Sequence, residues 1–352
     1  MVFGKYELKK YHIKGIALAI IPDMDDVKIQ CKGKDIKQQQ VTDSSLFSVA
    51  SISKWVTAWG IMKLYQDGFI DIDQSVTKYL SDLSDYVKLR SNITVRQLLS
   101  HTSGLASKIH IGKSIGKKTK IKDDFLSFRD VYKELKIKFN PGEKFEYTGS
   151  GYTLLQLLVE KVSGIKFEQY MTENVLRPLG MRNSYFHVPR ELLDDSRGIL
   201  KDNNNLREYS KAAAGLYTNI SDLIKFAKAN MESSLDKNED ILNKFYINMM
   251  QQRIRREIPY GLGNYIHSLP NNNKVVMHDG LNIGWMSRVL ILPHMNKGII
   301  ILCRGNNASK CISKITLQWL EEQVGELNSF YRSKLQFSSY FSFIAKKNMS
   351  RN

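Results

Sequence analysis

The chain has few cysteines, no metal-binding spacing of residues and too few acidic groups to balance its basic ones. Its 352 residues include only three cysteines, Cys31, Cys303 and Cys311. An odd and sparse set does not form a disulfide framework, and no CxxC or Cys/His spacing is present. We therefore expect neither a disulfide-stabilised module nor a metal site.

The sequence also lacks a long apolar run. The apolar segment at 16–22 is far shorter than the roughly 20 residues of a membrane-spanning helix. The first residues, MVFGKYELKKYHIKG, contain no apolar region of the kind that a secretory signal requires. As written, the chain is expected to be cytoplasmic, unless the segment that exports it lies outside this sequence.

Acidic residues are in deficit, with 35 Asp and Glu against 52 Lys and Arg, which gives a net charge of +17. Such an excess attracts polyanions: nucleic acid, anionic lipid or an anionic cell-wall polymer. Aromatic residues do not alternate with the basic clusters at 113–122 and 253–256, so no specific nucleic acid is expected. A general bias toward solvated lysines explains the same charge, and both interpretations stay open.

The residues that are present form two strand-rich ends and a helical middle. The predicted strands are 15–21, 27–31, 260–267, 274–278, 285–292 and 298–303. Short consecutive strands with tight turns favour an antiparallel meander. We therefore predict an α+β fold, in which one antiparallel sheet is built from both chain ends, is flanked by helices and has a mainly helical domain inserted.

These patterns give the predicted boundaries. Residues 1–65 and 255–327, which end in an amphipathic helix at 309–327, form the α/β domain, and 66–254 form the mainly helical inserted domain. Residues 328–352 are a basic, aromatic tail, of which 335–345 could lie on a membrane surface.

Four features of the inserted region are predicted. Thr94 is predicted to cap a short helix, and His101 near its end is interpreted as a structural, hydrogen-bonding histidine. Residues 106–124 read as a surface loop, and 125–136 show helical periodicity.

The most informative stretch is FSVASISKWV, residues 47–56, at the start of a buried helix. Ser48 is the predicted N-cap of this helix. Residues three apart share a helix face, so Ser51 Oγ and Lys54 Nζ are expected to lie side by side. A lysine in apolar surroundings can lose its proton near neutral pH and then deprotonate a serine hydroxyl. The pair therefore predicts a nucleophile with its base.

The Ser-x-x-Lys pattern is not specific by itself. It also occurs at Ser114 in a Gly/Lys-rich loop, at Ser163 before a helix-ending Gly164, and at Ser234 among Asp and Asn. An isolated match is equally explained by a helix N-terminal serine and a lysine that reaches toward solvent. Only Ser51 opens an apolar helix that could hold its lysine in a dry site.

A serine acyl-transfer enzyme also needs a group that relays a proton to the leaving group. Tyr147 lies between a Pro-Gly turn and a buried helix, and a protonated lysine nearby would lower the pKa of its phenol. By pattern, Tyr217 and Tyr246 compete with it, because each is followed two residues later by an Asn.

The third group follows a predicted strand at His278-Asp-Gly280. Gly280 would let a substrate backbone approach the strand, and the N–H groups of Ser51 and Leu281 could form an oxyanion hole. His278 could hydrogen-bond the Ser51–Tyr147 network or a substrate carboxylate. His110-Ile-Gly matches the same pattern, but it lies in a loop with no strand before it.

Together, these motifs resemble the penicillin-recognising serine hydrolases, and most closely the class C β-lactamases, D-alanyl-D-alanine carboxypeptidases and related esterases. The motifs are Ser51-x-x-Lys54, Tyr147-x-Gly149 and His278-x-Gly280, in this order. The resemblance covers roughly residues 12–325 and includes TVRQLLSHTSGL at 94–105, RPLGM at 177–181 and AGLYTNISDL at 214–223.

The resemblance implies a β-lactamase/transpeptidase-like fold with the active site between the two domains. It implies Ser51 as the acylated nucleophile, Lys54 as the base or its electrostatic partner, and Tyr147 as the general acid/base for the leaving group. His278 would replace the third-motif lysine or histidine, and the N–H groups of Ser51 and Leu281 would form the oxyanion hole. No metal or cofactor is implied, and the family is often extracytoplasmic.

One residue departs from the family pattern. Gly149 stands where the second motif commonly ends in an Asn that reaches the substrate's amide, a hydrogen bond worth about 0.5–1.5 kcal/mol. The sequence predicts a serine hydrolase that forms a Ser51 acyl-enzyme with a D-amino-acid peptide, a β-lactam or a small ester. The alternative is a catalytically idle penicillin-binding-like protein that binds an anionic cell-wall polymer, a membrane surface or another polyanion.

Overall fold

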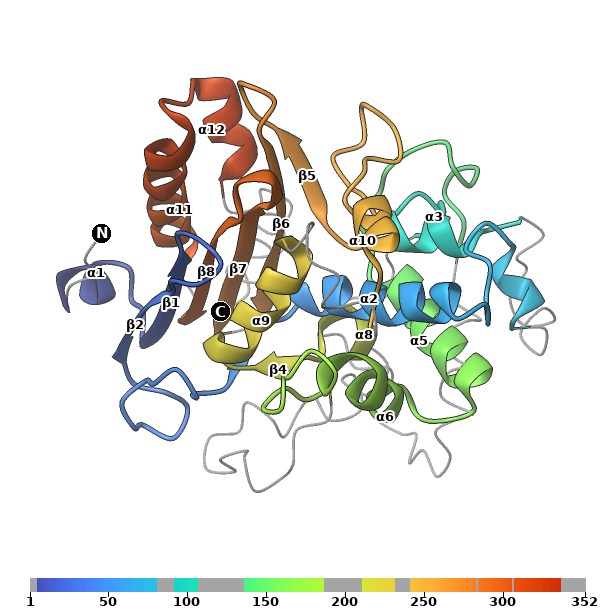
Figure 1. Cartoon of the computed structure of the whole chain (residues 1–352), viewed down its shortest axis with the longest axis horizontal. Helices are drawn as coiled ribbons and strands as arrows, with labels where there is room; N and C mark the ends of the chain where they lie inside the picture. The colour runs from blue at the N-terminus through green and yellow to red at the C-terminus, as the bar shows by residue number, and fades with distance from the viewer. Residues whose placement is uncertain are drawn as a thin grey trace.

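The computed structural model (Figure 1) describes residues 5–80, 92–106, 136–186, 211–231, 241–282, 284–305 and 307–336. The predicted loop at 106–124 and helix at 125–136 lie outside these residues except at positions 106 and 136. His110, Ser114 and Ser234, which shared motif patterns with the candidate site, also lie outside them.

A six-stranded antiparallel sheet with the order β2-β1-β8-β7-β6-β5 forms the centre of the fold. Its strands are β1 Gly15–Ile21, β2 Lys28–Gly33, β5 Tyr265–Ser268, β6 Lys274–Asn282, β7 Trp285–Leu292 and β8 Lys297–Arg304. Strand β1 pairs with β8, so the two ends of the chain lie side by side. This confirms the predicted sheet built from both chain ends.

Both faces of the sheet are covered by helices. One face carries α11 (Ser309–Val324) and α12 (Ser329–Leu335), and the other faces α9 (Ile220–Met231) and α2 (Ile52–Gln66), as Figure 1 shows. Strand β7 is buried along its whole length for this reason. Successive side chains of a strand point to opposite faces, and Val289 and Leu290 accordingly belong to different hydrophobic cores.

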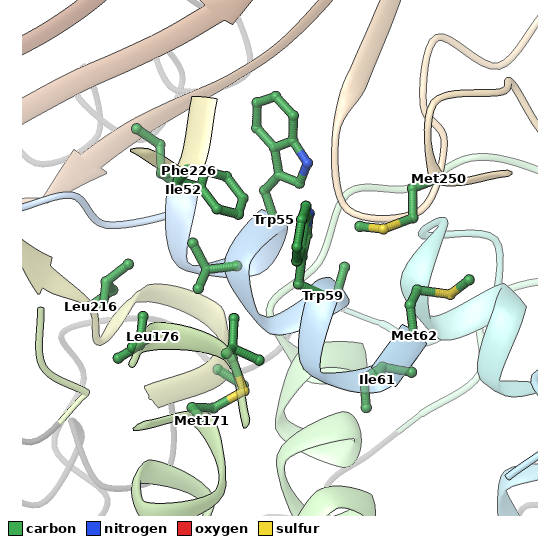
Figure 2. Packing of buried hydrophobic residues seen from close by; sticks show 14 of the residues in the cluster. Ile52, Trp55, Trp59, Ile61, Met62, Met171, Leu176, Leu216, Phe226 and Met250 are labelled. Carbon is green, nitrogen blue, oxygen red and sulfur yellow. The ribbon is translucent and has the colours of Figure 1, made fainter. Parts of the chain in front are cut away.

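Helix α2 is buried on nearly its whole circumference. Figure 2 shows Trp55 and Trp59 beside Phe226, with ring centroids 5.4 Å and 5.7 Å from that of Phe226. A Cβ on Gly60 would lie 2.5 Å from the sulfur of Met171, so a larger residue there would displace that flexible side chain. A helix packed on all sides keeps its polar residues away from water, and Lys54 is one of them.

Further helices, turns and two short strands are described. They are α1 Lys5–Lys10, α3 Val95–Leu99, α5 Ser150–Ser163, α6 Phe167–Met171, the π-helical turn Thr172–Leu176, α8 Lys211–Ala214, α10 Lys244–Met250, the 3-10 turns Val76–Lys78 and Pro293–Met295, and the short strands β3 Phe47–Ser48 and β4 Tyr217–Thr218.

The predicted N-cap of the Ser51 helix is wrong. Ser48 belongs to β3, where it pairs with Tyr217 of β4, and the helix begins only after Ser51. Pairing with β4 keeps this segment extended, and Ala50, with φ +46°, then turns the chain into the helix. The nucleophile candidate therefore occupies the N-cap position itself.

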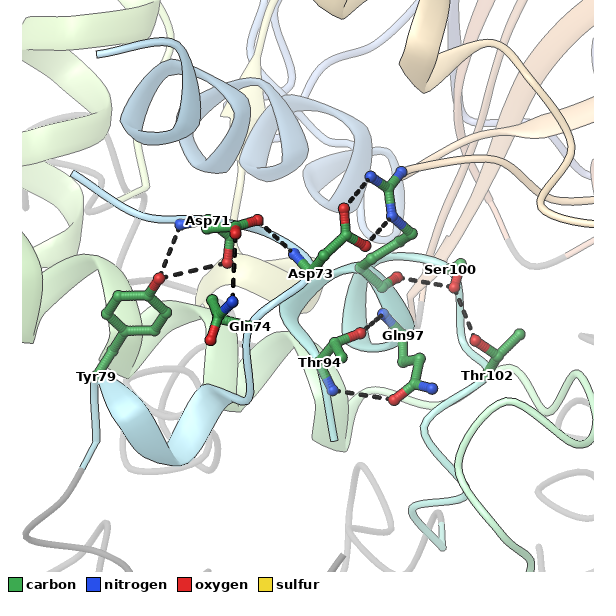
Figure 3. Close-up of polar contacts among 9 residues, drawn as sticks. Asp71, Asp73, Gln74, Tyr79, Thr94, Gln97, Ser100 and Thr102 are labelled. Carbon is green, nitrogen blue, oxygen red and sulfur yellow. Dashed lines mark hydrogen bonds and ion pairs between the residues drawn. The ribbon is translucent and has the colours of Figure 1, made fainter. Parts of the chain in front are cut away.

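The predicted cap of the short helix α3 is confirmed. Thr94 Oγ1 accepts from the Gln97 N–H at 3.2 Å, and the Gln97 side chain accepts from the Thr94 N–H at 2.9 Å, which is a capping box. Figure 3 shows this pair near Asp73, which forms a bidentate ion pair with Arg96. These contacts fix the segment that leads into His101.

The predicted domain boundaries stay a prediction. Two helices, however, pack against the sheet although they lie outside the predicted α/β domain. Helix α9 lies inside the predicted insertion, yet it packs against β1, β7 and β8. Helix α12 lies inside the predicted tail, yet Leu335 is fully buried against the sheet layer. Within the described ranges, no helix combines the length and apolar character needed to cross a bilayer.

Candidate active site

Ser51 and Lys54 meet as their spacing predicts. Lys54 Nζ lies 3.2 Å from Ser51 Oγ and donates to the carbonyl oxygen of Ala213 at 2.7 Å. Both side chains are buried, with 6% and 3% of their surfaces exposed. The lysine is thus held by one fixed acceptor and points its nitrogen at the serine hydroxyl.

Burial changes the proton affinity of Lys54. Removal from water disfavours its ammonium form and lowers the pKa to about 7. At neutral pH, a large fraction of Lys54 is therefore an uncharged amine with a free lone pair. Such an amine can accept the hydroxyl proton of Ser51.

The carbonyl that holds Lys54 is itself fixed by neighbouring groups. Thr57 Oγ1 donates to the Ala212 carbonyl at 3.0 Å, and the Ala212 N–H donates to Gln156 Oε1 at 3.2 Å. The Leu216 N–H donates to Ser53 Oγ at 2.9 Å. Helices α2 and α5 therefore clamp the segment that carries Ala213, which sequence reasoning did not identify as part of the site.

The backbone before Ser51 is docked onto the sheet. The Val49 N–H donates to the Leu216 carbonyl at 3.1 Å, and Ser287 Oγ of β7 donates to the Val49 carbonyl at 3.0 Å. A Cβ on Gly280 would overlap that same carbonyl oxygen. The glycine is thus required by the chain's own Val49, which corrects the expectation that it makes room for a substrate backbone.

Tyr147 lies over Lys54, whose Nζ is 5.0 Å from the centroid of the phenol ring. Burial raises the pKa of the phenol, and hydrogen bonding with Ser51 offsets only part of this effect. The predicted lowering of its pKa by a charged lysine is wrong, because both groups are desolvated. Tyr147 is a neutral phenol at pH 7, suited to donating a proton rather than taking one.

The other candidates with similar patterns lie elsewhere. Tyr246 contacts Tyr65 near the C-terminal end of α2, with ring centroids 5.4 Å apart, and Tyr217 lies in β4. Ser163 donates its hydroxyl to the Val159 carbonyl of its own helix at 2.7 Å. Among the described serines of the Ser-x-x-Lys pattern, only Ser51 contacts Lys54. Among the three tyrosines compared by pattern, only Tyr147 does so.

His278 is fully buried and engaged within the protein. Its Nδ1–H donates to the Asp279 carbonyl at 2.7 Å, and its Nε2 accepts from the Tyr260 hydroxyl at 3.0 Å. Burial, with the nearby Lys54 charge, lowers its pKa to about 3, so the ring is neutral. In this geometry His278 supports the aromatic surroundings of Tyr147, and the expected contact with a substrate carboxylate is not available.

Two backbone N–H groups stay candidates for the oxyanion hole. Within the part of the chain that the structure describes, no hydrogen bond uses the Ser51 N–H. Strand β5 pairs with β6 only over residues 274–277, so Leu281 lies beyond the end of its described neighbour. Asn282 donates to Ser48 Oγ at 3.0 Å and ties this edge to the Ser51 segment.

Aromatic and histidine rings surround the Lys54 side chain. Tyr147 contacts His101, Tyr260 and Tyr265, with ring centroids 4.3 Å, 6.2 Å and 6.1 Å away. Lys54 Nζ lies 5.6 Å from the Tyr152 ring. Apart from Tyr147, the sequence did not assign these rings to the site, because a ring cluster drawn from separate parts of the chain has no local pattern.

Within the described ranges, no three His, Cys, Asp or Glu side chains gather in a way that could hold a metal ion. The groups that meet here are a nucleophile, an amine, a phenol and backbone donors, which suit acyl transfer.

The chain is similar to known proteins over most of its length. A model of the family described as Beta-lactamase matches residues 5–317. The protein Flp of Staphylococcus aureus strain MW2 is 26% identical over 317 residues, which cover 86% of this chain and 62% of Flp. The chain thus spans less than two thirds of that relative's length.

Solved structures share the fold. The octameric penicillin-binding protein homologue from Pyrococcus abyssi is 26% identical, with a TM-score of 0.68, covering 85% of this chain and 71% of that one. A D-alanine carboxypeptidase from Burkholderia cenocepacia superposes with a TM-score of 0.68 at 20% identity, over 85% of this chain and 91% of that one. At that identity, the second likeness concerns the fold alone.

Proposed function

Because this chain belongs to the beta-lactamase family, whose fold is that of serine hydrolases, we propose that it forms an acyl-enzyme at Ser51 with an ester or amide substrate. One observation carries the proposal. A buried lysine with a pKa near neutrality lies 3.2 Å from a serine hydroxyl, beneath a neutral phenol. A base and a proton donor placed in this way can activate a serine hydroxyl for attack on a carbonyl carbon.

In the proposed reaction, each step is carried out by one group. The uncharged Lys54 amine takes the Ser51 proton as Oγ attacks the substrate carbonyl, and the N–H groups of Ser51 and Leu281 stabilise the resulting oxyanion. Tyr147 donates its phenolic proton to the leaving group, and the Lys54 ammonium restores that proton. Water then releases the acyl group by the same route in reverse.

The rate of acylation is expected to rise with pH and to reach half of its plateau near pH 7. The reason is that only the uncharged amine of Lys54 can act as base, and burial lowers its pKa to about 7. Below that pH, the rate should fall about tenfold per pH unit. The measurement is acetylation by p-nitrophenyl acetate, followed by intact-protein mass between about pH 5 and pH 9.

Lys54→Met is the control, since it keeps an unbranched side chain of similar length and removes the base. It should acylate slowly and without the step near pH 7. If the wild-type profile is flat, or rises only near the ordinary pKa of lysine, Lys54 is not the base.

Gly149 favours esters over amides in this site. It is the N-cap of α5 with φ −76°, so its backbone does not require glycine. A Cβ there would meet only the Ala213 Cβ, at 3.9 Å. Ala213 in turn holds Lys54. A Cβ is therefore sterically permitted at this position, and the lack of a side-chain amide there leaves the amide of a substrate without that partner.

Gly149→Asn is accordingly expected to increase acylation by a penicillin about 2- to 10-fold relative to acylation by a simple ester, the effect of one neutral hydrogen bond. Intact-protein mass gives both rates. Gly149→Ala is the matched control, because it adds the Cβ without the amide. An equal change in both variants would mean that the amide plays no part and that Gly149 does not set this preference.

A second candidate function rests on the net charge of +17. We propose as the alternative a catalytically idle protein that binds an anionic polymer through this charge. Such binding weakens steeply with salt and is unchanged in Ser51→Ala. Salt-dependent binding to an anionic cell-wall polymer, together with no adduct at any pH, would favour this alternative over the hydrolase.

A further inference from the structure

His101 makes three contacts with the segment that carries Tyr147: two hydrogen bonds to its backbone and one ring contact with the phenol. Its carbonyl oxygen accepts from the Glu146 N–H at 2.9 Å, and its Nδ1 accepts from the Thr148 N–H at 3.3 Å. Its ring lies 4.3 Å from the Tyr147 ring, centroid to centroid. One residue therefore binds the backbone on both sides of the tyrosine and packs against the phenol between them.

The position of His101 is itself well determined. It follows α3, whose capping box and Arg96–Asp73 ion pair hold that helix, and Ser100 Oγ donates to the Arg96 carbonyl at 2.8 Å (Figure 3). His101 adopts φ +59°, a left-handed conformation that non-glycine residues rarely take. This conformation turns both its carbonyl and its ring toward the segment that carries Tyr147.

A purely packing role would be better filled by an apolar ring. His101 is 1% exposed, and because Nδ1 accepts, Nε2 carries the proton. Within the described residues, that buried Nε2 has no hydrogen-bond partner. An unpartnered buried donor destabilises a protein, and phenylalanine would avoid it. What phenylalanine cannot do is accept from the Thr148 N–H.

We propose that His101 is a positioning residue, which holds the Tyr147 phenol in place for proton transfer to the leaving group. This inference rests on the proposed function. Proton donation matters only when the leaving group is a poor one. The contribution of His101 must therefore depend on the leaving group, whereas a general structural defect would slow all substrates alike.

The test compares two esters with the same acyl group, p-nitrophenyl butyrate and ethyl butyrate. His101→Phe should lower kcat/KM on the ethyl ester at least about tenfold, and on the p-nitrophenyl ester less than about threefold. His101→Asn should retain most activity on both, because its amide oxygen can replace Nδ1 as acceptor. The thermal unfolding midpoint of each variant is measured alongside.

A double-mutant cycle gives an independent readout. If His101 acts through Tyr147, His101→Phe should cause no further loss on the ethyl ester in a Tyr147→Phe background. If His101→Phe does not fold, His101→Gln takes its place, since its amide reaches the Nε2 position instead of Nδ1. Equal losses on both esters, additive losses in the cycle, or no loss at all would overturn the proposal.

Failure of the proposed function would look different. A wild-type chain with no Ser51-dependent hydrolysis of either ester would overturn the hydrolase proposal, and this inference with it. Loss of the leaving-group dependence alone, with Ser51-dependent hydrolysis intact, would overturn only the role of His101.

Discussion

Ser51→Ala is expected to leave no covalent adduct when the protein is exposed to a fluorophosphonate. The substitution removes the only described serine hydroxyl that lies within hydrogen-bond reach of the buried Lys54 amine. Loss of the nucleophile in a serine hydrolase typically lowers turnover on the order of 10⁴- to 10⁶-fold. Intact-protein mass measures the adduct, and hydrolysis of p-nitrophenyl butyrate measures the turnover.

The chain provides a matched control for this experiment. Ser163 also begins a Ser-x-x-Lys pattern, but its hydroxyl is bound to the Val159 carbonyl in its own helix. Ser163→Ala should label at the wild-type rate. Retained labelling in Ser51→Ala would overturn the assignment of the nucleophile, and peptide mapping of the adduct would then identify the residue that reacts.

The second large effect is expected on stability. Asp279→Asn should lower the free energy of unfolding by about 3–5 kcal/mol, because it leaves a buried guanidinium without its counter-charge. Arg288 is fully buried and pairs with Asp279 through two bonds of 2.6 Å and 2.7 Å. Arg288 Nη1 also donates to the Leu335 carbonyl of α12 at 2.9 Å. The measurement is equilibrium unfolding in urea.

Asp73→Asn is the control for this prediction. Asp73 also forms a two-bond pair with an arginine, Arg96, but its side chain is 56% exposed. Water already solvates such a pair, so the loss should stay below about 1 kcal/mol. If the two variants lose similar stability, burial does not increase the contribution of the Asp279–Arg288 pair to the free energy of unfolding.

Asp279 lies between His278 and Gly280, so this ion pair also bears on the site. The pair and the Leu335 contact hold β6 and β7 to α12 on one face of the sheet. On the other face, Ser287 and Gly280 of the same two strands receive the Val49 carbonyl. The chain end beyond the predicted sheet thus contributes to the rigidity of the strands that support Ser51.

Local sequence patterns determined several features correctly. The bounds of β1 and β7 are as predicted, because alternating and continuous apolar runs of that length fit strands covered on both faces. The cap at Thr94 was predicted from its residue type, and the structure adds the reciprocal bond of Gln97. The meeting of Ser51 with Lys54 follows from the period of the helix alone.

Non-local contacts decided what the local patterns could not. Ser48 has the chemistry of an N-cap, but pairing with β4, about 170 residues away in the chain, keeps it in a strand. Gly280 was expected to face a substrate, yet it receives the chain's own Val49. His278 was expected to hydrogen-bond the Ser51–Tyr147 network or a substrate carboxylate, yet Tyr260 and the Asp279 carbonyl use both of its nitrogens.

The sequence by itself determined which residues are available for the chemistry: a serine and a lysine on one helix face, a tyrosine after a turn, and a glycine where an amide is common. Only the tertiary structure decided their protonation and alignment. Packing on all sides of α2 removes water from Lys54 and lowers its pKa, while the rings around Tyr147 raise the pKa of its phenol. The physical reason is that desolvation depends on every segment that covers a group, and no single stretch of sequence contains them all.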